Sequence, residues 1–127
     1  MMIKSDITMK RDMDLIRQML LALEAHPHGF APDKIEIDGY TQEEIGYHAY
    51  LLGQAGLAEV VNITCNESDS PEALVRKLTW AGHEFLDSAR EKETWNQAKD
   101  LINKIGGATM QIWVAVLTKI IEKKLNL

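Results

Sequence analysis

The sequence contains little of what would anchor a protein in a membrane or stabilise it outside the cell. Cys65 is the single cysteine among 127 residues, so no disulfide forms within the chain, which is typical of a reducing compartment. The longest apolar run, Ile112–Leu117, has six residues, whereas a membrane-spanning helix needs roughly 18. No apolar stretch behind the first basic residues resembles a signal peptide. We therefore predict a cytoplasmic protein with no membrane partner.

Basic residues are also scarce. The chain carries 14 Lys and Arg against 19 Asp and Glu, a net charge of −5. Residues 1–66 carry five basic and ten acidic residues, whereas residues 67–127 carry nine of each. Proteins that bind nucleic acid mainly through its phosphates usually present a basic surface. This charge balance argues against such a surface.

The remaining composition is that of an ordinary folded domain. Apolar residues make up 46% and charged residues 26% of the chain, enough for one hydrophobic core without a stabilising metal or disulfide. No internal repeat or long linker divides the sequence. We predict a single domain over residues 1–127, with a core over 9–92 and a C-terminal helical extension over 94–127.

Local sequence signals predict five helices and three strands. Thr41 and Glu44 form a capping box at the start of one helix, and Gly56 is expected to end it in a left-handed conformation. Thr79 and Thr94 are expected to cap two later helices, and Trp80, Trp95 and Trp113 to anchor the core. The expected helices cover Asp12–Ala25, Gln42–Gln54, Trp80 to about Lys92, Trp95–Ile105 and about Ala108–Leu125; the expected strands cover Lys34–Asp38, Leu57–Thr64 and Ala73–Leu78.

The order of these elements predicts an α+β fold that is mostly α. Helix, short strand, helix and a β-hairpin followed by a helix is the order of a winged-helix domain, with the hairpin as its wing. A complete winged helix has two helices between the first strand and the hairpin, but Gly39–Gly56 has room for one. We therefore predict a reduced helix-turn-helix plus a wing, with additional C-terminal helices.

Two kinds of segment resemble known proteins. Glu44–Glu59 is similar to the reading helix and following strand of bacterial winged-helix regulators, and Leu78, Thr79, Gly82 and Leu86 match their wing-to-helix pattern. Met9–Arg17 and Leu78–Asp87, followed by Trp95, resemble the domain-of-unknown-function 2513 family of bacteria and phages. This resemblance implies a phage- or prophage-linked protein of winged-helix type, and it carries no established activity.

Two functions remain open at this point. As a DNA-binding transcriptional regulator, the protein would contact double-stranded DNA through Gln42, Tyr47, Tyr50, Arg76 and Lys77. Glu43 and Glu44 would oppose the phosphates, and the Gln42 helix contains neither Arg nor Lys. The alternative is a protein-interaction module that keeps the scaffold without binding DNA. A continuous basic strip would favour DNA, formed by Lys4, Lys10, Arg11, Arg76 and Lys77.

Other reactive residues are better explained by packing or solvent contact. His48 is expected half-buried beside the core. Neighbouring residues on a helix point about 100° apart, so His83 and Glu84 do not converge on a metal. Neither Cys65 nor the loop histidines, His26 and His28, lie in a catalytic or ligand pattern. We predict no enzyme, no metal site and no cofactor.

The last helix is apolar over much of its circumference, which favours pairing with a second copy. Many winged-helix regulators dimerise through a terminal helix, which spaces two reading helices along DNA. We predict a homodimer through Ile112, Trp113, Val116, Leu117 and Ile120. The alternative is that this helix folds back over its own sheet.

Overall fold

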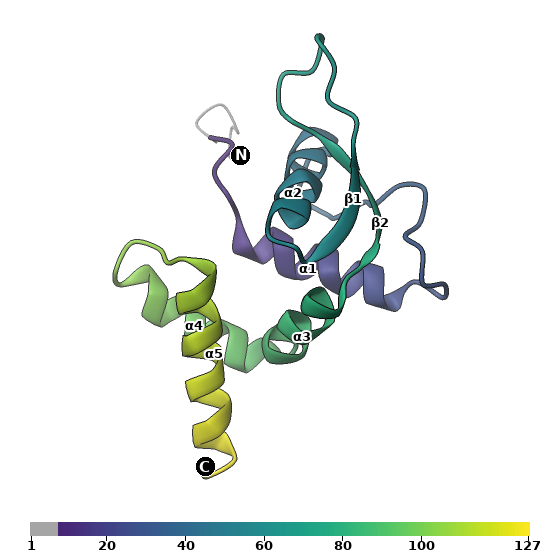
Figure 1. Ribbon diagram of the computed structural model, residues 1–127. Helices are drawn as coiled ribbons and strands as arrows, with labels where there is room; N and C mark the ends of the chain where they lie inside the picture. Colours follow the sequence, from purple (N-terminus) through teal and green to yellow (C-terminus); the bar gives the residue numbers. More distant parts are fainter. Residues whose placement is uncertain (1–7) are drawn as a thin grey trace.

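A computed structural model describes residues 8–127 as five helices and one two-stranded antiparallel sheet (Figure 1). The α+β, mostly helical class is as expected from the sequence. The elements in chain order are α1 (Met13–Ala25), α2 (Gln42–Gln54), β1 (Ala58–Asn62), β2 (Ala73–Leu78), α3 (Trp80–Ala89), α4 (Lys92–Asn103) and α5 (Met110–Lys124).

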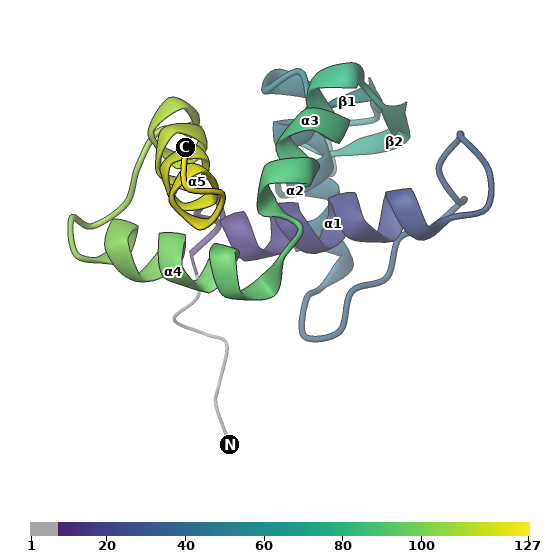
Figure 2. The same cartoon turned by 90° about the horizontal axis from the view of Figure 1, so that it is seen from below.

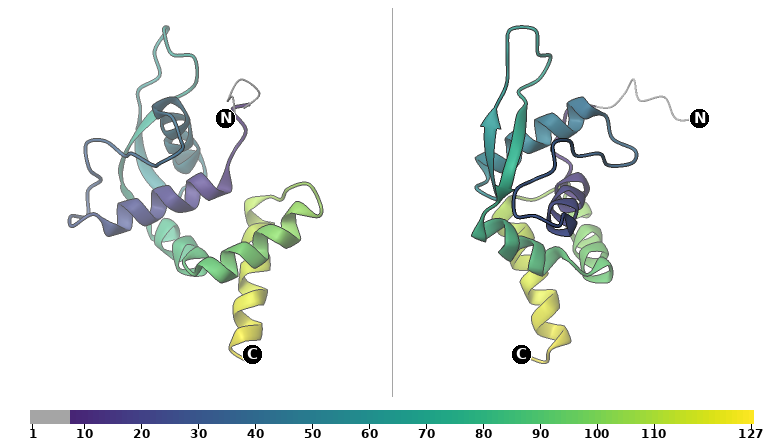
Figure 3. Two further views of the ribbon diagram at one scale, coloured as in Figure 1. Left: turned by 180° about the vertical axis from the view of Figure 1, so that it is seen from behind. Right: turned by 90° about the vertical axis from the view of Figure 1, so that its right-hand side faces the viewer.

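The elements form two connected parts on either side of α1. The hairpin and α2 pack against one another, and α3 returns from β2 to α1 (Figure 1). The other part is the α4–α5 pair, which lies at the N-terminal end of α1, with the C-terminal end of α5 projecting from the body (Figures 2 and 3). Buried side chains from all five helices and both strands belong to one hydrophobic cluster. The extension therefore shares the core of the rest of the chain.

The start of α1 links three parts of the fold. Asp12 is its N-cap, and its carboxylate accepts hydrogen bonds from the backbone N–H groups of Asp14 and Leu15. The other carboxylate oxygen accepts a bond from the Tyr40 hydroxyl at 3.0 Å. The backbone N–H of Asp12 donates to His48 Nε2 on α2. One residue thus satisfies the first turn of α1 and holds two distant segments beside it.

The strand expected over Lys34–Asp38 does not form, and that prediction was wrong. Ala31 N donates to Arg76 O on β2 at 2.8 Å, but Pro32 has no N–H to extend a ladder and the chain bends at Asp33. The alternating pattern has another cause. Ile35 and Ile37 pack partly buried against the core from an irregular segment, which a glutamine of α2 also holds, since Gln42 Nε2 donates to Ile35 O.

From α2 onward, the helices and strands agree in outline with those predicted from the sequence, but some of their boundaries are shifted. The capping box of α2, the left-handed Gly56 and the Thr79 cap of α3 are confirmed. Thr94 is not a cap: α4 starts at Lys92 and its N-cap is Glu91. The buried Thr94 hydroxyl instead donates to the Glu91 carboxylate of the preceding turn, and Lys124 of α5 donates to both side chains.

The three tryptophans differ in burial. Trp95 and Trp113 are buried and stacked with ring centroids 4.5 Å apart, as expected of core anchors. Trp80 is 80% exposed, so its predicted place on the buried side of α3 was wrong. It lies in the first turn of α3, and the core contacts of this helix come from Phe85, Leu86 and Ala89 further along.

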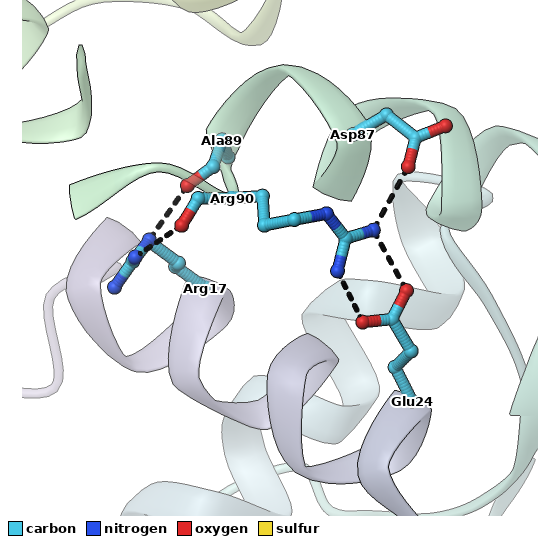
Figure 4. A network of polar contacts seen from close by, with 5 residues as sticks. All are labelled: Arg17, Glu24, Asp87, Ala89 and Arg90. Carbon is cyan, nitrogen blue, oxygen red and sulfur yellow. Dashed lines mark hydrogen bonds and ion pairs between the residues drawn. The ribbon is translucent and has the colours of Figure 1, made fainter.

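Two arginines hold the end of α3 against α1 (Figure 4). Arg17 of α1 donates to the carbonyl oxygens of Ala89 and Arg90 at 2.6 and 2.7 Å, which satisfies carbonyls left open at a helix C-terminus. Arg90 in turn donates to the carboxylates of Glu24 and Asp87. Its hydrogen bonds lower the pKa of Glu24. The network sets the sharp joint between α3 and α4.

The Tyr40–Asp12 bond predicts a change in stability at alkaline pH. Burial, followed by the hydrogen bond to Asp12, raises the pKa of the Tyr40 phenol above its ordinary value. The folded state therefore retains this proton longer than the unfolded state, and the stabilisation is lost as pH rises above about 10. Tyr40→Phe should cost about 1 kcal/mol at neutral pH and should flatten the fall in stability above pH 10. Urea unfolding at pH values from 7 to 11 measures both the loss of stability at neutral pH and the fall in stability above pH 10.

Tyr50→Phe is the matched control for this experiment. Its hydroxyl accepts a hydrogen bond from Gln54 of the same helix on the surface, so its removal should leave the alkaline profile unchanged. An unaltered alkaline slope in Tyr40→Phe would contradict the role given to the Asp12 bond.

Candidate functional site

The exposed face of α2 carries aromatic and acidic side chains. At 100° per residue, Glu43, Tyr47, Tyr50 and Gln54 share the side opposite the buried residues of this helix. The rings of Tyr47 and Tyr50 stack at 6.5 Å with an interplanar angle of 17°. Since α2 contains no Lys or Arg, this face carries no positive charge. The groups that it could present to a DNA phosphate are tyrosine hydroxyls and a glutamine amide.

The remaining DNA-contact candidates lie on the hairpin and beside it. Arg76 and Lys77 of β2 both pair with Glu59 of β1, with nitrogen–oxygen distances of 3.4 and 4.0 Å. The Arg76 guanidinium also lies 5.8 Å from the ring centre of Phe30. Gln42 and Arg76 line the same groove, which Tyr47 and Tyr50 do not line. Four of the five candidates are therefore divided between two surfaces, and Lys77 lines neither of them.

The basic residues proposed to form a strip are also divided. Lys10 and Arg11 line a separate cavity near the α4–α5 turn, where Arg11 donates to Ala108 O at 3.0 Å. Arg76 lies at the hairpin groove instead. Lys4 lies outside the described residues. The described basic residues of the predicted strip therefore do not lie on one continuous surface.

The groove beside α2 is a cavity of about 900 Å³. Its walls are residues 30–35, the N-terminal half of α2, the outer edge of β2, Val61 of β1 and the hairpin loop. The loop extends past the N-terminal end of α2 (Figures 1 and 3), and Ser70 in it donates to the Glu43 carboxylate at 2.7 Å. We call this cavity the acidic groove because of the five carboxylates that line it: Asp33, Glu43, Glu67, Asp69 and Glu72.

Positive charge near this groove is small. Lys34 and Arg76 are its basic lining residues, and each already pairs with a glutamate, Glu36 and Glu59 respectively. Over residues 33–72 the sequence has nine Asp and Glu against one Lys. The groove and its surroundings therefore attract cations and repel phosphates.

The groove also exposes apolar side chains. Phe30 is 60%, Leu74 52% and Val61 44% exposed, and all three line it. Clustered exposed apolar side chains with a charged rim are typical of a surface that binds another molecule. This site is not among those predicted from the sequence. Its signals were the acidic excess over residues 33–72 and apolar residues at consecutive positions of the hairpin strands.

His48 has a structural role. It is 2% exposed, more deeply buried than the half-buried position expected from the sequence. The Asp12 N–H donates to Nε2 at 2.9 Å, so Nδ1 carries the proton and donates to Glu44 O at 2.8 Å. Both ring nitrogens are engaged within the chain.

The other reactive residues are scattered. Among residues 8–127, no three His, Cys, Asp or Glu side chains are grouped to hold a metal ion. Cys65 is exposed in the hairpin loop, where a hydrogen bond with Ser68 lowers the pKa of its thiol. No helix within residues 8–127 is long and apolar enough to cross a membrane.

The predicted dimer residues of α5 differ in accessibility. Trp113 and Leu117 are buried within the chain, and α5 packs on α4 and α3. Ile112 is exposed, and Val116 and Ile120 are partly buried. Dimerisation stays a prediction, and a second copy would have to contact the outward residues. The alternative, that α5 folds back over the sheet, does not match its packing.

The comparisons with known proteins place this chain in a family. The family model described as "Hypothetical protein (DUF2513)" matches residues 10–109. The chain belongs to the DUF2513 family. A Haemophilus influenzae relative described as "Uncharacterized protein" is 40% identical over 97 residues, which cover 74% of this chain and 79% of the relative. No solved structure matches the chain significantly. The DUF2513 match contains all residues of the acidic groove and ends at Thr109, the N-cap of α5.

Proposed function

We propose that this DUF2513 protein is a non-enzymatic interaction module that binds a Lys- and Arg-rich segment of a protein partner in the acidic groove. The observation that carries the proposal is the groove itself, about 900 Å³ in volume and lined by five carboxylates against two basic side chains. Opposite charge across an interface steers association and excludes like-charged partners. The exposed Phe30, Leu74 and Val61 supply apolar area for the same segment.

The scaffold supports this proposal. We propose that α1, α2, the hairpin and α3 form a reduced winged-helix core in which the acidic groove takes the place of a nucleic-acid surface. In a DNA-binding winged helix, the reading helix and the wing approach phosphates. Here the corresponding loop carries Glu67 and Asp69 and no Lys or Arg. A cytoplasmic location, a phage or prophage link and a homodimer stay predictions on this scaffold.

DNA binding is the second candidate. It is favoured by the order of α2 and the hairpin, by the stacked and partly buried Tyr47–Tyr50 pair and by Arg76 and Lys77 beside one another on β2. It would need phosphate contacts strong enough to outweigh the carboxylates around the groove. Binding of this kind weakens steeply with rising salt.

Fluorescence anisotropy separates the two candidates. One probe is a pool of labelled ten-residue peptides with Lys or Arg at alternate positions and Val, Ile, Thr or Phe between them. The other probe is a pool of labelled random DNA duplexes. At low salt we expect the peptide pool to bind and the duplex pool not to bind. Duplex binding without peptide binding would overturn the interaction module in favour of DNA contact.

A charge-matched pair of variants locates the peptide. Asp33→Asn, Glu67→Gln and Asp69→Asn together remove three exposed charges from the groove, and we expect them to weaken peptide binding about tenfold at low salt. The control variant removes the same charge from exposed positions of α3, α4 and α5: Glu84→Gln, Asp100→Asn and Glu122→Gln. Equal affinities of the two variants would show that net charge and not the groove binds the peptide, against the proposal.

A further inference from the structure

We infer that the partner segment binds as an added β-strand along the open edge of β2, with basic side chains toward α2 and apolar side chains on the outer face of the hairpin. This inference rests on the proposed function and adds the mode of binding. The groove lies along this edge, since Glu72, Ala73, Leu74, Val75 and Arg76 all line it. Strand addition to an exposed sheet edge is a general mode of peptide recognition.

The backbone of β2 presents hydrogen-bonding groups to the groove. In an antiparallel pair, alternate residues turn their N–H and C=O groups away from the partner strand. Ile63 N donates to Glu72 O at 3.0 Å, and β1 pairs Val61 with Leu74. Ala73 and Val75 therefore direct their N–H and C=O groups to the open edge. No other residue in the range 8–127 is hydrogen-bonded to these groups from that side.

The chain itself begins a third strand and then leaves the edge. Ala31 N donates to Arg76 O, as a third strand would do next to β2. Pro32 follows without an N–H, and the chain bends at Asp33, while residues 31–35 line the groove. Within residues 8–127, the N–H and C=O groups of Ala73 and Val75 on this edge are left without a backbone partner. An added strand would continue the sheet from the position at which residues 30–31 stop.

The two sides of the groove select different side chains. Successive side chains of a strand point to opposite faces, so an added strand directs one row toward α2 and the other toward the outer face of the hairpin. The first row meets the Glu43 carboxylate at the start of α2. The second row meets Leu74, Val61 and Phe30, which are exposed. An extended segment of alternating basic and apolar residues complements both rows.

Amide hydrogen exchange followed by NMR tests the strand on the full-length protein. With the alternating peptide pool at saturation, we expect exchange of the Ala73 and Val75 amides to slow at least about tenfold, since each gains a hydrogen bond. The Leu74 amide, which faces β1, is the internal control and should change little.

Methylated peptides provide an independent test. One pool carries N-methyl groups on the backbone nitrogens of the Lys and Arg positions, and the other carries them on the positions between. N–H groups of alternate residues face opposite edges of a strand, so one pool should lose binding at least about tenfold while the other keeps it.

The outcomes separate the mode of binding from the function. Loss of peptide binding by the groove variant, together with unchanged Ala73 and Val75 exchange and equal binding of the two methylated pools, would overturn strand addition and leave the interaction module standing. If the unmethylated pool fails to bind at low salt, the proposed function and this inference are both wrong.

Discussion

Gly82→Ala should destabilise the protein by about 3 kcal/mol or more, which for a small domain removes a large part of its stability. A Cβ atom at Gly82 would lie 2.0 Å from the carbonyl oxygen of Leu57 and 3.0 Å from its carbonyl carbon. Both atoms belong to the backbone, so no side-chain rotation relieves the overlap. Urea unfolding followed by circular dichroism measures the loss of free energy.

The contact at Gly82 joins the start of α3 to the start of β1. Thr79 N donates to Leu57 O at 3.1 Å, and the Thr79 hydroxyl donates to Gly56 O at 2.6 Å. Moving α3 outward to make room for a methyl group would lengthen both bonds. The overlap therefore cannot be relieved without a loss of hydrogen bonds at the same joint.

Gly29→Ala is the control for this substitution. A Cβ at Gly29 would have no atom within 4 Å, and this residue is exposed in the loop after α1. We expect its free energy of unfolding to stay within about 0.5 kcal/mol of the parent protein. If the two variants unfold alike, the close packing of α3 on β1 described above is wrong.

Elements with strong local signals could be predicted from the sequence. The start of α2 is encoded locally. The Thr41 side chain accepts a hydrogen bond from the Glu44 N–H, and the Glu44 side chain accepts one from the Thr41 N–H. Gly56 ends it with φ +75°, a conformation that glycine adopts without strain. The β-branched residues of the first hairpin strand likewise predict that strand, and in each case the cause lies within a few residues of the element.

Elements that depend on distant contacts could not be predicted. The Lys34–Asp38 pattern is that of a strand, but the segment is held by Gln42 and Tyr40 rather than by a sheet. Thr94 matches a capping pattern, yet its hydroxyl is bound by Lys124, which lies 30 residues further along the chain. Local propensity is a weak guide where such contacts decide the conformation.

The acidic groove is also formed by segments that are distant in the sequence. Its walls come from the loop after α1, the start of α2 and the hairpin loop, and their proximity follows from the whole fold. The sequence revealed the acidic excess in the N-terminal half, which already argued against a phosphate-binding surface. It could not reveal that Glu43 and Glu67 share a cavity with Phe30 and Leu74.

Trp95→Ala should cost about 3–5 kcal/mol, within the range of buried aromatic residues that leave a cavity. Trp95 is 1% exposed and lies where α1, α3, α4 and α5 meet. Its ring stacks on Trp113 and lies perpendicular to the ring of Phe85, and its Nε1–H donates to Asp14 at 2.7 Å. Truncation to Ala removes all of these contacts and leaves the Asp14 carboxylate without this donor.

The conservative variant separates packing from hydrogen bonding. Trp95→Phe keeps an aromatic ring next to Trp113 and loses the bond to Asp14, so it should cost less than Trp95→Ala. Trp80→Ala is the control, because Trp80 is 80% exposed, and it should change the free energy of unfolding by about 0.5 kcal/mol or less. Urea unfolding of the three variants gives this order.

Limited proteolysis shows which part of the fold depends on Trp95. Because the Trp95–Trp113 stack is part of the packing that holds α5 on α4 and α3, loss of the stack should expose the α4–α5 turn to cleavage before the hairpin. Early cleavage in the hairpin, with α5 still protected, would contradict this. The acidic groove lies on the other side of α1. A Trp95 variant that remains folded over residues 8–90 should therefore still bind the peptide pool. This result would mean that α5 supports the core and is not part of the binding surface.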